Sequence, residues 1–263
     1  MVRRFVKRLY LALILLFLYA PIFVLMVYSF NVSKSRGNWG GFTFGWYAEL
    51  FRDRQIMQAL WNTIVLAVLS AVIATFLGTA SAIGINAMKK LPKRVILGIN
   101  NLPVLNPDIV TGVSLMILFI FAFNMIGRGG LGFTTILLAH ITFNIPYVIL
   151  SVLPKLKQLD KNMYEAALDL GATPAAAFFK VILPEITPAI VSGMILAFTL
   201  SIDDFIISFF TTGAGVSNLS IIIYSMARRG VNPKINALST LIFAVVMILL
   251  YLVNRMDSEK LKH

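Results

Sequence analysis

Two adjacent carboxylates, Asp203 and Asp204, lie within an apolar stretch of this 263-residue sequence, and a third, Asp108, begins another. An ionised side chain near the centre of a membrane helix costs about 2.5–3.5 kcal/mol on insertion scales, so acids at such positions are functional candidates. Carboxylates there can replace the hydration that a cation loses on leaving water. An anion would instead need cationic side chains and helix N-termini. The three acids therefore indicate a route for a cation.

The segment that carries the two adjacent acids predicts a helix face of small and polar residues. This face has residues at three- and four-residue steps: Gly193, Ala197, Ser201, Asp204 and Ser208. Such a stripe is typical of a face that lines a path, which makes Ser201 and Ser208 candidate path residues. Asp203 points about 100° away, onto an apolar face. Two alternatives stay open: a buried hydrogen bond from either adjacent acid to a neighbouring helix, and interaction of Asp108 with its own helix N-terminus.

Aromatic residues near the ends of the apolar stretches are a second kind of candidate. The ring faces of Trp39, Trp46, Tyr47 and Tyr224 could hold cations and methylene groups. A belt of aromatic residues at the membrane interface is the alternative explanation. His140 has no second His nearby and no carboxylate at ligand spacing. We therefore expect it to form a hydrogen bond inside the protein rather than to bind a metal. We expect no metal and no cofactor.

The overall composition indicates a membrane protein. Apolar residues make up 59% of the chain and charged residues 13%, with a mean hydropathy of +0.86. Soluble domains have about 25% charged residues, so too little polar surface is left to cover a water-facing globule. The absence of Cys excludes disulfides and thiol catalysis. The net charge of +12 would suit nucleic acid, but the basic flanks of membrane spans explain it, and we expect no nucleic acid partner.

Six apolar runs are long enough to cross a hydrocarbon core of about 30 Å as helices. They are residues 9–30, 60–87, 109–126, 131–153, 186–210 and 237–253. We expect a single all-α transmembrane domain over residues 1–263. Asn106 is expected to cap the third span, with Pro107 at its first position. The second span has small residues that predict a close packing face: Ser70, Ala74, Gly78 and Ala82.

The basic residues predict the orientation of the spans. Most of the 23 Lys and Arg lie in the N-terminus, in the connections after the second and fourth spans, and in the C-terminus. Cytoplasmic segments of membrane proteins are enriched in these residues, so both termini are expected in the cytoplasm. The first span is expected to stay uncleaved, because its apolar run is longer than that of a signal peptide. The longest cytoplasmic connection is then 155–184.

This longest connection is too polar to span the membrane and has strong helix signals. Asn162 and Glu165 fit a capping box that opens a short helix, and Gly171 can end it in a left-handed turn. Thr173 is expected to cap a second short helix, which Pro184 stops. Two helices joined by a glycine turn form a rigid elbow that suits insertion into a groove of another protein. An ordinary interfacial connector is the alternative.

The same connection carries a long, spaced motif. Glu165-Ala166-Ala167 is followed by three residues, then Gly171, nine residues and Val181-Ile182-Leu183-Pro184. This pattern resembles the EAA loop of the membrane permeases of ABC importers, with Val181 where isoleucine is usual. The resemblance implies a type I importer permease fold and a coupling helix that docks into a cytoplasmic ATPase. It implies a coupling role for Glu165, Ala166, Ala167, Gly171, Leu183 and Pro184.

Further segments along nearly the whole chain resemble permeases for polyamines. They include Asn38-Trp39, Trp46-Tyr47, Pro107-Asp108, His140-Ile141-Thr142-Phe143, Ser201-Ile202-Asp203-Asp204 and Tyr224-Ser225-Met226. Together they resemble the second of the two membrane subunits of spermidine/putrescine importers. The resemblance implies a bacterial inner-membrane subunit with three kinds of partner: a second permease, an ATPase dimer and a periplasmic polyamine-binding protein. A polyamine is a chain of ammonium groups and methylenes, which suits the carboxylate and aromatic candidates.

No catalytic constellation accompanies these features, and we expect a transport subunit rather than an enzyme. The sequence lacks the G-x-x-x-x-G-K-[ST] phosphate loop, H-E-x-x-H and G-x-S-x-G, so ATP hydrolysis is expected on a partner. Two alternatives to a polyamine importer remain. One is an ABC importer permease for another substrate: putrescine alone, iron, thiamine or an oxyanion. The other is a proton-coupled secondary carrier with Asp203 and Asp204 as a relay, a class in which two related halves are common.

Overall fold

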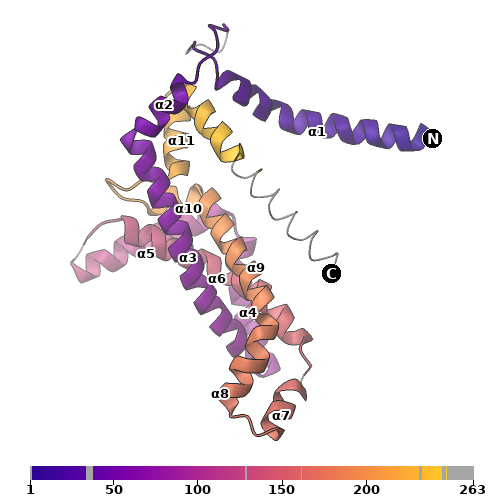
Figure 1. The fold of residues 1–263 in the computed structure, drawn as a ribbon. Coiled ribbons are helices and arrows are strands. Elements are labelled where there is room, and N and C mark those ends of the chain that lie inside the picture. Colours follow the sequence, from indigo (N-terminus) through magenta and orange to yellow (C-terminus); the bar gives the residue numbers. More distant parts are fainter. Residues whose placement is uncertain are drawn as a thin grey trace. The chain divides into compact units, whose positions relative to one another are not determined.

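The computed structural model describes residues 2–33, 38–127, 129–160, 162–230, 233–244 and 247. The described helices are α1 (Val2–Tyr28), α2 (Gly45–Arg52), α3 (Arg54–Ala87), α4 (Lys90–Leu105), α5 (Asp108–Ile126), α6 (Phe133–Gln158), α7 (Asn162–Asp169), α8 (Pro174–Ala177), the π-helix η1 (Phe178–Ile182), α9 (Leu183–Asp203), α10 (Ile206–Thr211) and α11 (Leu219–Arg228) (Figure 1). Residues 233–244 are helical as well. The chain forms two compact units, Gln58–Ile221 and Met1–Met57 with Ile222–His263.

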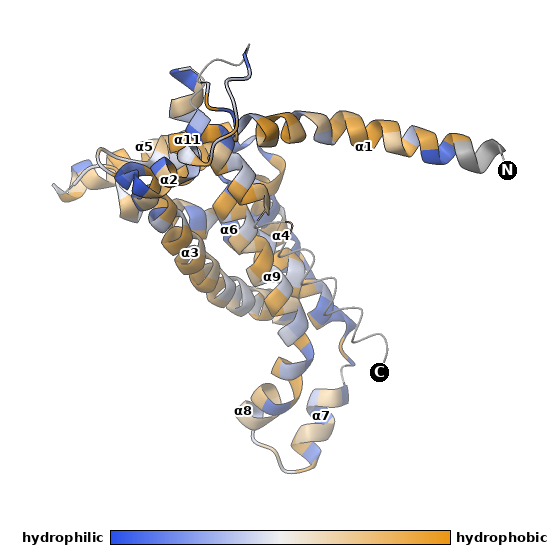
Figure 2. Cartoon of the chain, turned by 45° about the horizontal axis from the view of Figure 1, so that its top comes forward, coloured by the Kyte–Doolittle hydropathy of each residue, from blue (hydrophilic) through white to orange (hydrophobic). Residues whose placement is uncertain are grey.

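The spans have the predicted helical character. Among the described residues, five helical segments are long and apolar enough to cross a membrane: Val6–Tyr28, Arg54–Ala87, Asp108–Ile126, Phe133–Gln158 and Pro174–Asp203. They correspond to the first five predicted runs and confirm the all-helical fold. Figure 2 shows α1 in apolar colours over most of its length. The sixth predicted span, 237–253, lies mostly outside the described residues, and its described part, 237–244, is helical.

Helix α4 lies between the second and third predicted spans and was not expected from the apolar runs. Its 16 residues include Pro92, Pro103 and the adjacent pair Asn100 and Asn101, which hide the helical pattern. Pro92 lies in the first turn, where its missing N–H has no helical acceptor to lose. Partly buried Ile96 and Leu97 pack on the core around α6. Packing of the apolar side of α4 therefore stabilises this helix, although the sequence near its ends is unfavourable to helix formation.

The expected cap at Asn106 is wrong. Asn106 has extended backbone and ends α4, where its N–H donates to the Leu102 carbonyl at 3.0 Å. Pro107 is the residue that precedes α5, and its carbonyl accepts the N–H of Val110 at 2.9 Å. Proline has the fixed φ that lets a helix begin directly after it. The third span therefore begins at Asp108, one residue before the predicted position.

The fifth predicted span, 186–210, is not one continuous helix. Helix α9 ends at Asp203, Asp204 has extended backbone with φ −65° and ψ 126°, and α10 begins at Ile206. Aspartate side chains bond to nearby backbone N–H groups, and this bonding favours helix ends over helix interiors. The break thus places the two acids at the boundary between two helices.

The start of this helical run also differs from the prediction, because Pro184 does not stop a helix. The chain stays helical from Pro174 through η1 into α9. In η1 the turn is wider, and the N–H of Leu183 bonds to the carbonyl of Phe178, five residues earlier. A proline lacks the N–H for a normal turn and its ring clashes with the carbonyl four residues earlier. The π-turn accommodates both effects just before Pro184.

The core of the unit Gln58–Ile221 forms around α6, which packs along α9 over much of its length. Fully buried residues of α6 include Val148 and Val152, which belong to one core cluster with Ala71 and Ala82 of α3 and Ala197 of α9. The predicted small-residue face of α3 is confirmed as a packing face. Ser70, Ala74 and Ala82 on this face are all fully buried. Small side chains allow the helix backbones to approach closely where lipid offers no hydrophobic driving force.

Gly78 on this face is expected to tolerate no side chain. A Cβ at Gly78 would lie 2.7 Å from Val148 Cβ and 3.3 Å from the Ile145 carbonyl oxygen. We expect Gly78→Ala to cost about 1–3 kcal/mol of stability through overpacking, measured as thermal unfolding in detergent. The matched control is Gly84→Ala, on the same helix with nothing within 4 Å, which should be neutral or stabilising. Equal effects of the two substitutions would contradict the packing of α3 on α6.

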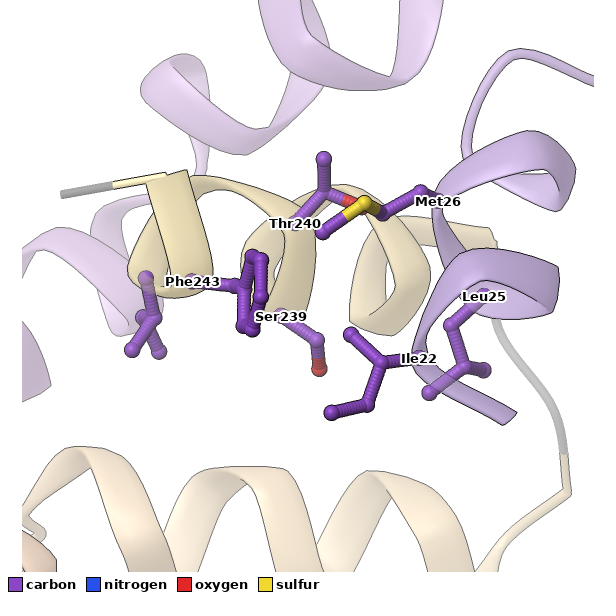
Figure 3. Close-up of a pocket in the computed structure, with 7 residues that line it drawn as sticks. Ile22, Leu25, Met26, Ser239, Thr240 and Phe243 are labelled. Carbon is purple, nitrogen blue, oxygen red and sulfur yellow. The ribbon is translucent and has the colours of Figure 1, made fainter. Parts of the chain in front are cut away.

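The unit Met1–Met57 with Ile222–His263 contains α1, α2 and the helical residues 233–244. Side chains of α1 and of this last segment line an apolar pocket (Figure 3): Ile22, Leu25, Met26, Ser239, Thr240, Ile242 and Phe243. Lys234 binds to acids of α2 and its C-terminal end, with Nζ 3.6 Å from Glu49 Oε2 and 3.3 Å from Asp53 Oδ2. These contacts connect segments that are far apart in the sequence.

Candidate functional site

The carboxylate of Asp204 is held inside the protein at the break between α9 and α10. Its Oδ1 accepts the N–H of Ile207 at 3.2 Å, and its Oδ2 accepts the N–H of Ser208 at 2.7 Å. Oδ2 also lies 3.4 Å from Nε2 of His140 on α6, and the two side chains are only 9% and 2% exposed. The acid therefore satisfies the free N–H groups at the start of α10 and connects that helix to α6.

A hydrogen-bond network extends from this acid. His140 Nε2 lies 2.9 Å from Ser208 Oγ, and Asn218 Nδ2 donates to the same oxygen at 2.7 Å. The carbonyl of Asp204 accepts a longer bond from Asn218 Nδ2 at 3.4 Å. The side-chain oxygen of Asn218 accepts the N–H of Ile221 in α11 at 3.0 Å. The interpretation of His140 as a hydrogen-bonding residue is confirmed, and it contacts α10 through both Ser208 and Asp204.

A second buried polar cluster lies nearby along the same helices. Ser201 of α9 accepts a hydrogen bond from Asn144 Nδ2 at 2.8 Å, and its hydroxyl lies 2.8 Å from that of Ser70 on α3. All three residues are buried. The side-chain oxygen of Asn144 is buried without a hydrogen-bond partner. The cluster connects α3, α6 and α9 at one point in the bundle.

The small and polar stripe of the fifth predicted span is thus a buried face in this chain. Gly193 and Ala197 pack toward α6, where a Cβ on Gly193 would lie 3.2 Å from Ser151 Cβ. Ser201 and Ser208 are hydrogen bonded within the bundle. Asp203, which was expected on an apolar face, is instead exposed at the end of α9. The structure therefore separates the two adjacent acids, and a path role for any of these residues stays a prediction.

The two adjacent acids are expected to differ in their effect on stability. Asp204→Ala removes two hydrogen bonds to α10 and leaves His140 with a weaker set of partners, which should cost about 1–3 kcal/mol. Asp203→Ala changes an exposed side chain and should change stability little. Thermal unfolding of the two variants in detergent measures the difference. Equal melting temperatures would contradict the capping role of Asp204.

Asp108 occupies the first position of α5 and is exposed. A carboxylate at this position interacts favourably with the positive end of the helix dipole, which was the alternative to a path role. Its exposure also leaves it accessible to a cation. Both interpretations therefore remain compatible with its position.

The predicted aromatic candidates lie in the other unit. Trp46 is buried, and its Nε1 donates to the Asn31 carbonyl at 2.7 Å. Tyr47, which follows Trp46 in α2, has its hydroxyl 2.7 Å from Oγ of Ser29, a residue just after α1. These bonds fix α2 to the loop after α1. Trp39 and Tyr224 are exposed.

The predicted elbow is present, with one changed cap. Helix α7 begins at Asn162, and the N–H of this residue bonds to Asp160 Oδ1 at 2.9 Å, so Asp160 and not Asn162 supplies the capping oxygen. Gly171 follows α7 with φ +84°. Its N–H bonds to the Leu168 carbonyl at 2.9 Å and that of Ala172 to the Ala167 carbonyl at 3.0 Å. This pair of bonds forms the Schellman motif, which ends the helix as predicted.

The start of the second half of the elbow also follows the prediction, although its end does not. Thr173 Oγ1 accepts the N–H of Ala176 at 3.3 Å, and Pro174 is the first residue of α8. Helix α7 contacts both α8 and η1, and the three lie at one end of their unit (Figure 1). Leu170 at the turn is 90% exposed, and Phe179 in η1 is also exposed. The elbow therefore presents apolar side chains that nothing in the described part of the chain covers.

The residues expected to couple to an ATPase lie on or beside the elbow. Glu165, Ala166, Gly171 and Pro184 are exposed, and Ala167 and Leu183 are partly buried. Their exposure is compatible with docking.

Sequence reasoning missed Asn144, Asn218 and Asp160 as structural polar residues. Asn144 lies one helical turn from His140, so the four-residue spacing was the available signal. Among the described residues, no group of three metal-ligating side chains occurs.

A family model described as "Binding-protein-dependent transport system inner membrane component" matches residues 74–256. This match covers more than half of the chain and includes the elbow and both polar clusters, apart from Ser70.

Two relatives from Escherichia coli (strain K12) match nearly the whole chain. The putrescine transport system permease protein PotI is 41% identical over 257 residues, covering 94% of this chain and 90% of its own. The spermidine/putrescine transport system permease protein PotC is 37% identical over 262 residues, covering 100% of this chain and 97% of its own. The sequence is thus homologous to permease subunits of polyamine transport systems.

A solved structure has the same fold at low sequence identity. It is the bacterial alginate ABC transporter in complex with an alginate pentasaccharide-bound periplasmic protein, with a TM-score of 0.74 and 18% identity. The alignment covers 98% of this chain and 94% of that chain. This similarity shows the fold of an ABC importer permease.

Proposed function

The chain belongs to the family of binding-protein-dependent transport system inner membrane components, and we propose that it is a membrane-spanning permease subunit of an ATP-driven importer for polyamines. The observation that carries this proposal is the end-to-end similarity to two permeases named for putrescine and spermidine/putrescine transport. The chain then forms half of a translocation path and hydrolyses no ATP itself.

The proposed assembly has four kinds of component. A second, homologous permease completes the path, an ATPase dimer binds on the cytoplasmic side, and a periplasmic protein delivers the polyamine. The solved alginate transporter, crystallised with a ligand-bound periplasmic protein, supports this last partner. The chain lies in the bacterial inner membrane with both termini in the cytoplasm, an orientation that the positive-inside rule supports.

The elbow is the proposed connection to the ATPase. Its exposed Leu170 and Phe179 supply an apolar surface for a groove, and its Schellman turn fixes the angle between α7 and α8. The helical run from Pro174 to Asp203 is continuous, so a movement at the elbow is transmitted along α9 toward Asp203. ATP binding that closes the ATPase dimer would thereby shift the bundle between outward and inward access.

Cation chemistry supports a polyamine over an anionic substrate. Exposed Asp203 and Asp108 can each replace water around an ammonium group. The contacts of Asp204 with Ser208 and His140 stabilise the helix break at which Asp203 is exposed. Exposed Trp39 and Tyr224 offer ring faces for methylenes and cations.

Competition for uptake tests the substrate. In vesicles that hold the complete transporter, unlabelled spermidine and putrescine should each reduce uptake of labelled polyamine. Sulfate should have no effect. A reduction of uptake by sulfate would overturn the substrate assignment, and so would the failure of both polyamines to reduce uptake. Neither result would change the family.

Putrescine alone is a second candidate substrate. The higher identity to the putrescine permease than to the spermidine/putrescine permease favours it. Inhibition by putrescine but not by spermidine in the same assay would select this candidate.

A further inference from the structure

Helix α4 has two opposite apolar faces, and only one of them packs against another part of the described chain. Ile96 and Leu97 pack against the core around α6. The other face carries apolar residues at three- and four-residue spacing, all more than half exposed, which we call the α4 stripe: Leu91, Val95, Ile99, Leu102 and Leu105. An exposed apolar face of this length is unusual in contact with water.

Cations gather where the α4 stripe begins. Lys89, Lys90 and Arg94 are exposed. Lys90 and Arg94 lie one turn apart on α4, each directly before a residue of the stripe, so they follow one border of it. Long basic side chains at such a border can lay their methylenes on apolar surface and extend their charge outward.

A fourth cation holds this region in place. Lys93 Nζ donates to the Asn86 carbonyl at 3.2 Å and to Asn86 Oδ1 at 3.1 Å, across the turn between α3 and α4. These bonds fix the start of α4 against the end of α3. The three exposed cations are therefore presented together on an ordered turn.

These cations have no acidic partner among the described residues. The sequence contains no Asp or Glu between Asp53 and Asp108. In the described residues, ion pairs join His140 to Asp204 and Lys234 to both Glu49 and Asp53, and none involves α4. Within the described part of the chain, no acidic side chain supplies the counter-charge for this surface.

We propose that the α4 stripe, with Lys89, Lys90 and Arg94 at its start, is a binding surface for anionic phospholipid. The apolar stripe contacts acyl chains, and the three cations bind the phosphate groups of the adjacent leaflet. A basic border on an apolar helix face is the arrangement that binds anionic membrane surfaces. In the proposed orientation this leaflet is the cytoplasmic one.

The distribution of charge along the α4 stripe favours lipid as its partner. The surface between Lys89 and Leu105 has charge only at one end, as expected for contact with headgroups at one depth and acyl chains below.

Lipid co-purification tests the proposal on the assembled transporter. The complex is reconstituted with phosphatidylcholine and about one quarter phosphatidylglycerol, re-extracted in mild detergent, and the retained lipids are quantified by mass spectrometry. Wild-type protein should retain phosphatidylglycerol above its share of the mixture. The triple variant Lys89→Gln, Lys90→Gln, Arg94→Gln should lose this preference by about fivefold for each charge removed.

A matched control removes the same number of charges elsewhere on the side predicted to be cytoplasmic. Lys155→Gln, Lys157→Gln and Lys180→Gln together should keep the preference of wild type. Equal loss in both triple variants would mean that only net charge matters, which would overturn a localised surface. An unchanged preference in the α4 variant, or loss of the second permease or the ATPase from its complex, would overturn the proposal in favour of a protein contact.

Discussion

Replacing Gly171 by valine is expected to reduce ATP-driven uptake at least tenfold while the protein still inserts and folds. Gly171 has φ +84°, a conformation that a β-branched residue adopts only with strain of about 1–3 kcal/mol. Nothing lies within 4 Å of a Cβ at this position, so the substitution causes no steric clash. Its effect is to release the Schellman turn and change the angle between α7 and α8. Uptake of labelled polyamine by proteoliposomes with the complete transporter measures the loss.

The matched control for this elbow variant is Gly215→Val. Gly215 has φ +88° and is equally open, but it lies in the loop between α10 and α11. Backbone strain is therefore similar, whereas the ATPase contact is not affected. Gly171→Val should reduce the ATPase that co-purifies with the permease, and Gly215→Val should not. Normal ATPase binding and normal uptake in Gly171→Val would contradict the coupling role of the elbow.

The second large effect is expected at Asp203. Asp203→Asn should lower uptake efficiency by about tenfold or more, because an ammonium–carboxylate contact contributes more than a contact with a neutral amide. The change should appear mainly in KM, with melting temperature unchanged, since this side chain is exposed.

Asp204→Asn is the comparison that separates substrate contact from structure. The amide oxygen of Asn can still accept a hydrogen bond from α10, and Asn is a good helix-capping residue, so part of the cap is retained. We expect a smaller change in KM than for Asp203→Asn, together with some loss of stability. The reverse order of effects on KM would show that the buried acid, rather than the exposed one, contacts the substrate.

The sequence predicted the elements that depend on local rules. Gly171 and Thr173 were identified as helix-ending and helix-capping residues, because a left-handed turn and a side-chain cap each need few residue types. The small-residue face of α3 followed from four-residue spacing alone. In each case the deciding interactions lie within a few residues or along one helix.

Two of the predictions that failed depend on contacts between helices. The helix break at Asp204 involves contacts with His140 on α6 and with Asn218 beyond α10, which lie outside the range of local sequence rules. Helix α4 is stabilised by packing against the core around α6. Its two prolines gave no reason to expect a helix from the sequence. Pro184 was expected to stop a helix because sequence rules for proline do not include a π-turn before it.

The central claim is that this chain carries polyamine only when a partner ATPase drives it. The most direct measurement is uptake of labelled spermidine and putrescine into vesicles that hold this chain and its sister permease, with the binding protein supplied, in the presence and absence of the ATPase. Uptake is expected only with the ATPase and ATP, and it should not depend on a proton gradient. Uptake driven by a proton gradient without the ATPase would contradict it.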